Sequence, residues 1–129
     1  MKIVQGFPPN YDAIKKALNP NVSAVFTYGD TIYCPYYQGT LPYHLIVHET
    51  THQVQQGTNP EGWWKLYLVN PDFRLSQELA AYRAQYKHFA MGRDRNDAAR
   101  FLYVLAHDLA SAMYGNIITL DKAVDLIMK

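Results

Sequence analysis

The sequence predicts an α+β domain in which several helices pack with one small antiparallel sheet, and two observations lead to this fold class. Apolar residues recur at helical spacing between capping and stop signals over most of the chain, whereas only one short stretch is rich in β-branched and aromatic residues. The chain has 129 residues, enough to bury one hydrophobic core and too few for two ordinary domains. We therefore expect a single domain over residues 1–129.

The predicted sheet is a β-hairpin with strands over residues 24–28 and 31–34. Both strands are β-branched and aromatic, and the Tyr-Gly-Asp-Thr segment between them is typical of a tight turn. A short helix over residues 10–18 precedes the hairpin, capped by Asn10 and stopped at Pro20. No other stretch predicts a strand.

Start and stop signals divide the remaining chain into five helices. Asn-Pro-acid triplets at residues 59–61 and 70–72 predict helix starts, because Asn caps, Pro fits the first helical position and the acid favours the helix dipole. Gly57 and Gly92 predict helix ends. The expected helices cover residues 42–56, a short stretch from residue 59, 70–91, 94–114 and 119–128.

The helix over residues 42–56 carries the sequence His48-Glu49-Thr50-Thr51-His52. Residues four apart lie on one face, about 6 Å apart along the axis, so the two imidazoles can bind one ion. Glu49 points in a rotated direction, which suits a general base that deprotonates a water on the metal. The chain has one cysteine, Cys34, so the ligands must be histidines and carboxylates. We expect Zn²⁺ at His48 and His52, with Glu49 as the catalytic residue.

A catalytic zinc needs a third protein ligand, and Glu78 is the best candidate. Glu78 lies three residues after Leu75 and four before Tyr82 in an apolar helical stripe, where an unpaired carboxylate is costly. The alternative explanation of this carboxylate is a salt bridge. Its candidate partners are Arg74, Arg83 and Lys87.

Other residues are weaker candidates for the third ligand. Helix capping already explains Glu61 and Asp72. His44 shares a face with His52, but the two are about 12 Å apart along a straight helix, too far to bind one ion. We expect His44 at the mouth of a cleft or in solvent.

These residues resemble the gluzincin branch of the zincin metallopeptidases, in which a His-Glu-x-x-His helix supplies two zinc ligands and a Glu on a later helix supplies the third. The matching residues are His48, Glu49, His52 and Glu78. The length and order of the elements are similar to minimal single-domain minigluzincins and to zincin-like proteins of phages and bacteria. The resemblance covers about residues 24–86, and it implies a hydrolase that cleaves peptides or proteins. The substrate would lie extended along the hairpin edge.

The chain departs from this family at one position and leaves another role unassigned. Many gluzincins carry an Asp four residues after the third ligand, where this chain has Tyr82, so we expect Tyr82 to orient a ligand or to stabilise the oxyanion. Further candidate oxyanion donors are His88, His107 and Tyr114. Two alternatives therefore stay open: a zincin-like binding or structural protein without useful turnover, and a latent peptidase whose last helix, residues 119–129, covers the cleft.

The composition indicates which classes of partner to expect. Lys and Arg total 12 and Asp and Glu total 11, with no basic cluster, so we expect no nucleic-acid partner. The sequence has no apolar run of about 18 residues and no apolar leader, so we expect no membrane segment and a cytoplasmic location. Trp63, Trp64 and Tyr67 are interpreted as packing residues, and Cys34 is given no role. The oligomeric state is left open.

Overall fold

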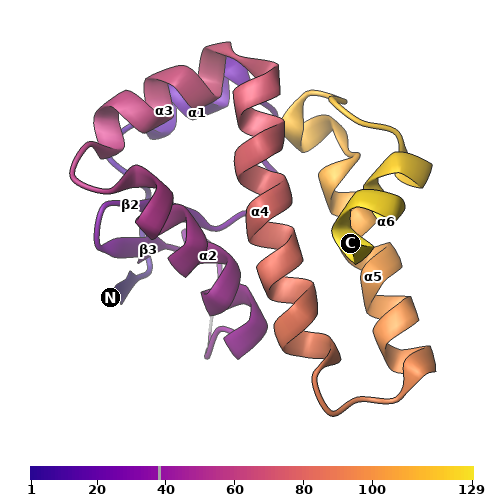
Figure 1. Cartoon of the computed structure of the whole chain (residues 1–129). Coiled ribbons are helices and arrows are strands. Elements are labelled where there is room, and N and C mark those ends of the chain that lie inside the picture. Colours follow the sequence, from indigo (N-terminus) through magenta and orange to yellow (C-terminus); the bar gives the residue numbers. More distant parts are fainter. Residues whose placement is uncertain (38) are drawn as a thin grey trace.

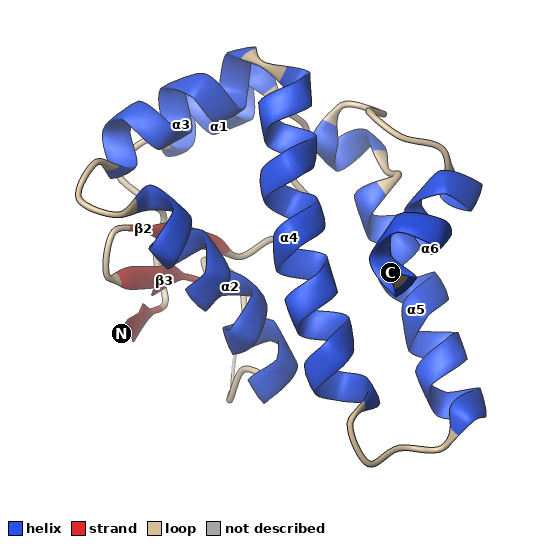
Figure 2. Ribbon diagram, in the orientation of Figure 1, coloured by secondary structure: helices blue, strands red, loops and turns tan. Residues whose placement is uncertain are grey.

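The structure is a computed structural model that describes residues 1–37 and 39–129, and it places a small sheet beside a set of helices (Figure 1, Figure 2). The strands are β1 (Lys2–Val4), β2 (Phe26–Tyr28) and β3 (Thr31–Tyr33). The helices are α1 (Tyr11–Ala17), α2 (Tyr43–Gln56), α3 (Pro60–Val69), α4 (Pro71–Ala90), α5 (Arg95–Leu109), the 3₁₀ helix η1 (Ala112–Tyr114) and α6 (Leu120–Met128). The predicted α+β class is confirmed. None of the helices in these described ranges is long and apolar enough to cross a membrane.

The sheet has the strand order β1-β3-β2. The expected hairpin is present, with β2 and β3 antiparallel and Thr27 opposite Ile32. The expectation of a hairpin alone was wrong, because β1 adds a parallel strand with Ile3 also opposite Ile32. Three exposed residues are too short to show an alternating pattern, so only the pairing with β3 defines this strand. As a result β2, which faces the helices, is an edge strand.

The capping signals set the bounds of most helices. Asn59 and Asn70 each accept a hydrogen bond from the backbone N–H three residues later, and a proline opens each helix, as the sequence predicts. Gly57 adopts a φ of 56° after α2, a conformation that favours glycine at a helix end. Asn10 occupies the predicted N-cap position of α1, but its side chain makes no capping hydrogen bond there.

The expected continuous helix over residues 94–114 was also wrong. Helix α5 ends at Leu109, and η1 follows as a separate 3₁₀ turn. Both the hydroxyl and the backbone N–H of Ser111 bond to the carbonyl of Asp108, which competes with helix continuation. The break turns Tyr114 back toward the interior of the protein, where its side chain is buried.

The described residues form two separate apolar clusters. One fills the space between α4, α5 and α6 and includes Leu102, Leu105, Leu109 and Ile127. The other joins α1 and β2 to α3 and includes Ile14, Phe26, Trp63, Trp64 and Tyr67. The buried side chains of α2 belong to neither cluster, and all of them are polar: His48, Glu49, His52 and Gln56.

Candidate metal centre

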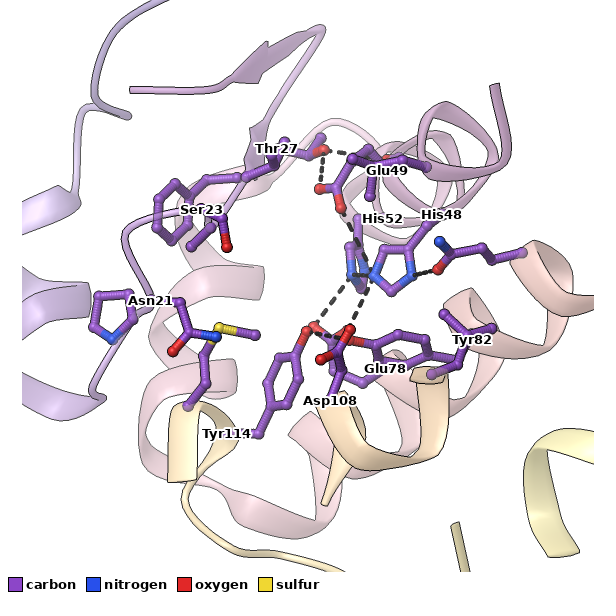
Figure 3. A pocket seen from close by; sticks show the side chains of 18 of the residues that line it. Asn21, Ser23, Thr27, His48, Glu49, His52, Glu78, Tyr82, Asp108 and Tyr114 are labelled. Carbon is purple, nitrogen blue, oxygen red and sulfur yellow. Dashed lines mark hydrogen bonds and ion pairs between the residues drawn. The ribbon is translucent and has the colours of Figure 1, made fainter. Parts of the chain in front are cut away.

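Helices α2 and α4 bring the three expected metal ligands together. Figure 3 shows His48 and His52 on neighbouring turns of α2, facing Glu78 from α4. All three side chains are buried, with exposed fractions of 3%, 5% and 3%. The two Nε2 atoms lie 3.1 Å apart, and the two oxygens of Glu78 lie 3.2 Å from one Nε2 each.

This triangle of donor atoms fits a single metal ion. Two ligands about 2.0–2.1 Å from a tetrahedral zinc lie about 3.3 Å from each other, and one ligand atom from each of the three residues lies within 4.8 Å of the others. At 3.1 Å, the two Nε2 atoms can hold either a proton or a metal cation between them. His48, His52 and Glu78 therefore form a buried group that could hold a metal ion.

Gln85 sets the tautomer of His48. The Nδ1–H of His48 donates to Oε1 of Gln85 at 2.9 Å, which leaves the lone pair of Nε2 directed at the centre. The amide of Gln85 is itself held, because its Nε2 donates to Nδ1 of His44 at 2.9 Å. His44, whose pKa is lowered by burial and by Arg93 and His88, is therefore joined to the site through Gln85 and is not a ligand.

Gln55 does the same for His52. Nδ1–H of His52 donates to Oε1 of Gln55 at 2.8 Å, and Nε2 of Gln55 donates to the backbone carbonyl of Gln77 at 3.0 Å. Both imidazoles thus present an unprotonated Nε2 when neutral. Amide oxygens fill the role that a carboxylate or carbonyl commonly plays behind a metal-bound histidine.

The charges of the group depend on one another. Burial alone would raise the pKa of Glu78, but His52 and His48 hold it well below its usual range. Burial alone would lower the pKa of His52, but Glu78 and Glu49 raise it to about 9. Without a metal, the group is therefore a buried ion pair at neutral pH, and a metal must displace a proton from His52.

The alternative explanation of Glu78, a salt bridge to a basic residue, was wrong for the residues that the structure describes. Arg74 donates to the backbone carbonyls of Tyr67 and Tyr114, and Arg83 donates to the carbonyl of Leu126. Lys87 is exposed. Glu78 instead accepts a short hydrogen bond of 2.6 Å from the hydroxyl of Tyr67, a contact that the packing interpretation of Tyr67 did not include.

Glu49 lies beside the same group and is held by the sheet. The hydroxyl of Thr27 in β2 bonds to Oε1 of Glu49 at 2.9 Å, so this oxygen is committed. The other oxygen lies 3.7 Å from Nε2 of His48. Burial raises the pKa of Glu49, although His48 and His52 oppose the rise. The arrangement leaves one carboxylate oxygen directed at the metal position, with a raised proton affinity.

Tyr82 lies at the site but does not bond to a ligand. Its ring packs edge-on against His48 with centroids 4.5 Å apart, and its hydroxyl is 2.7 Å from that of Tyr114. Burial and the charge of Glu78 raise the pKa of both tyrosines, so both hydroxyls keep their protons. The orienting bond to His48 that Tyr82 was expected to make is made by Gln85.

The metal group opens on a cavity of about 290 Å³. Its walls come from α1, from the segment between α1 and β2, from β2, from α2, α3, α4 and α5, and from η1, and they are largely apolar and aromatic. No described residue of α6 lines this cavity, because α6 packs against α4 and α5. Figure 1 shows α6 on the side of α4 away from α2, so the alternative that residues 119–129 cover the cleft was wrong.

The remaining candidates lie elsewhere. His88 packs against Tyr43 with ring centroids 4.8 Å apart, and His107 is exposed. Neither histidine lines the cavity. Glu61 forms an exposed ion pair with Lys65, and Asp72 is exposed in the first turn of α4. The thiol of the buried Cys34 donates a hydrogen bond to the carbonyl of Val4. Of the expected oxyanion donors, Tyr82 and Tyr114 are the ones at the site.

Four residues that bond to the metal group or to its neighbours were given no chemical role from the sequence. They are Thr27, Gln55, Tyr67 and Gln85. Helical spacing could have indicated two of them, because Gln55 follows His52 by three residues and Gln85 follows Glu78 by seven, or two turns. Thr27 and Tyr67 come from other elements, and nothing local in the sequence points to their contacts.

Comparison of the chain with protein-family models, with curated proteins and with solved structures found no match. The class of site is therefore defined by its own atoms: a buried His-His-Glu metal group next to a fixed carboxylate, open to a cavity.

Proposed function

We propose that this protein is a zinc-dependent peptidase of the gluzincin type. The observation that carries the proposal is the triangle of His48, His52 and Glu78 with the free oxygen of Glu49 beside it. Two imidazole nitrogens and one carboxylate suit zinc, and three protein ligands with an open side are typical of catalytic rather than structural zinc. Zinc, when bound, would polarise a peptide carbonyl and acidify a water molecule.

Glu49 acts as the general base. Thr27 fixes its Oε1, so Oε2 is the atom that accepts a proton from water at the metal position. Burial raises the pKa of this carboxyl toward neutral pH, where a base transfers protons most effectively. The proton then passes to the departing amine.

Tyr82 and Tyr114 supply the hydroxyls for the oxyanion. They are protonated, line the cavity and lie next to the metal group. One of the two hydroxyls donates its proton to the other. The second hydroxyl can therefore donate its own proton to a developing negative charge. The aromatic walls around them exclude water and strengthen that interaction.

The peptide binds along the free edge of β2. Residues 23–27 line the cavity, and β2 is an edge strand that an extended peptide can join. The carbonyl of Thr27 already accepts from the side chains of Gln56 and Trp64, so this end of the edge is closed. Pairing is therefore restricted to Phe26 and to residues 23–25, which lead into the strand.

The test is the substitution Glu49→Gln, which keeps the shape and the bond from Thr27 but removes the base. Zinc content, measured by elemental analysis, should stay at one ion per chain, while cleavage of a diverse peptide library falls by about 10²–10⁴-fold. Glu61→Gln on the exposed face of α3 is the matched control and should cleave normally. Undiminished cleavage by the Glu49 variant would remove the assignment.

A second function, peptide binding without turnover, is favoured by one observation. The hydroxyls of Tyr82 and Tyr114 bond to each other, so the donors for the oxyanion are partly committed. A zinc-loaded protein that binds peptides yet cleaves none of the library would support this function over hydrolysis.

A further inference from the structure

The cavity has an unusual balance of charge. Apart from Glu49 and Glu78 at the metal group, Asp108 is the only Asp, Glu, Lys or Arg side chain on its wall among the described residues. Asp108 lies in the last turn of α5, and Figure 3 shows it on the side of the cavity across from Ser23 and Thr27.

The carboxylate of Asp108 has no protein partner among the described residues. Ser111 bonds to its backbone carbonyl, and no hydrogen bond or ion pair involves the side-chain oxygens. Val104, Leu105 and Met113 form the apolar wall near it. Burial raises the pKa of Asp108, whereas the charges of His48 and His107 act in the opposite direction. Asp108 is solvent-exposed as a whole residue, so this unpaired carboxylate on the cavity wall is accessible to a ligand that enters the cavity.

The charges facing the cavity leave Asp108 uncompensated. No described Lys or Arg side chain lines the cavity. His44, the remaining titratable base on the described wall, has a pKa lowered by burial, Arg93 and His88, so it is neutral near pH 7. Away from the metal group, the described wall therefore carries one negative charge, at Asp108, which attracts cations and repels acidic groups.

We propose that Asp108 makes this cavity selective for peptides that carry a positive group close to the bond positioned at the metal. This inference rests on the proposed function and adds the substrate class. A peptide paired with residues 23–26 lies between the strand edge and α5, so α5 forms the wall opposite the sheet. A lysine or arginine side chain, or a free terminal ammonium, on the α5 side of the peptide then meets Asp108.

The experiment measures peptide binding by calorimetry with the zinc-loaded Glu49→Gln variant, in which turnover is blocked. Three otherwise identical peptides carry Lys, Met or Glu at one position, scanned over two residues on each side of the central bond. Acetylated and free amino termini distinguish a side chain from a terminal ammonium as the source of the charge. We expect the best cationic peptide to bind about fivefold more tightly than its Met counterpart and the Glu peptide to bind more weakly.

Adding Asp108→Asn should abolish the preference for the cationic peptide. Asp121→Asn, the same charge change on α6 outside the cavity, should leave it intact. When Asp108 is unchanged, raising the salt concentration should weaken the preference for the cationic peptide. This measurement does not depend on an Asp108 variant. Equal binding of all peptides, absence of peptide binding, or a preference that persists in Asp108→Asn overturns the inference.

The experiment distinguishes failure of the inference about Asp108 from failure of the proposed function. Peptide cleavage by the wild-type protein with no charge preference overturns the role of Asp108 and leaves the peptidase proposal standing. Charge-selective binding with no cleavage by the wild type supports Asp108 and removes hydrolysis.

Discussion

The two faces of helix α4 bury opposite kinds of side chain. Toward α5 and α6, Leu75 and Leu79 pack against an apolar cluster. Toward α2, Glu78 and Gln85 are buried among the histidines and amides of the site. One face gains free energy by removing apolar surface from water, whereas the other loses free energy by desolvation and recovers it through hydrogen bonds and charge pairing.

This difference separates stability from chemistry within one helix. Substitutions on the apolar face can lower the stability of the metal-free protein without moving the donor atoms, because rigid helices hold those atoms in place. The polar face does not depend on a metal for its packing, since its groups pair with one another in the structure. Substitutions on the two faces should therefore affect different measurements.

The largest effect is expected from Glu78→Ala on the polar face. Removing one of three protein ligands should weaken zinc binding about a thousandfold, or about 4 kcal/mol. Competition with a chromophoric chelator measures this affinity. Glu61→Ala, which removes an exposed carboxylate on α3, should bind zinc as the wild type does. Equal zinc affinity in the Glu78 variant would show that this carboxylate is not a ligand.

In the cluster against which the apolar face of α4 packs, Leu109→Ala on α5 should reduce the free energy of unfolding by about 3 kcal/mol, because Leu109 is fully buried there. Urea denaturation of the metal-free protein measures the loss. Leu66→Ala on α3, where the side chain is 42% exposed, should cost less than about 1 kcal/mol. Zinc affinity of the folded Leu109 variant should stay within about twofold, and a parallel fall in affinity would mean that the two faces are coupled.

The smallest effect is expected from Gln85→Ala, which leaves every ligand in place and removes the bond to Nδ1 of His48. Zinc affinity should fall about tenfold, because the ring loses its fixed tautomer and orientation. Gln85→Glu should restore most of the affinity, since a carboxylate oxygen accepts the same bond. A slowly exchanging Nδ1–H signal of His48 should be seen by NMR in the wild type and disappear in Gln85→Ala, and unchanged affinity and signal would contradict this role.

Fold and site could be predicted to different depths from the sequence. The class, the hairpin and the helix starts at Asn59 and Asn70 followed from local signals, which act within a few residues. Strand β1 and the break after Leu109 did not, because the first depends on pairing with β3 and the second on a side-chain bond of Ser111 that competes with a good helical pattern.

The sequence by itself determined that His48, Glu49 and His52 share one region of a helix, and that Glu78 sits in an apolar stripe where a carboxylate needs a partner. Helical periodicity, a local property, is sufficient for both inferences. Only the tertiary structure decided which groups complete the site: Gln85 lies 37 residues from His48, and Thr27 lies 22 from Glu49. Such contacts depend on how whole helices and strands pack, and no spacing along the chain encodes them.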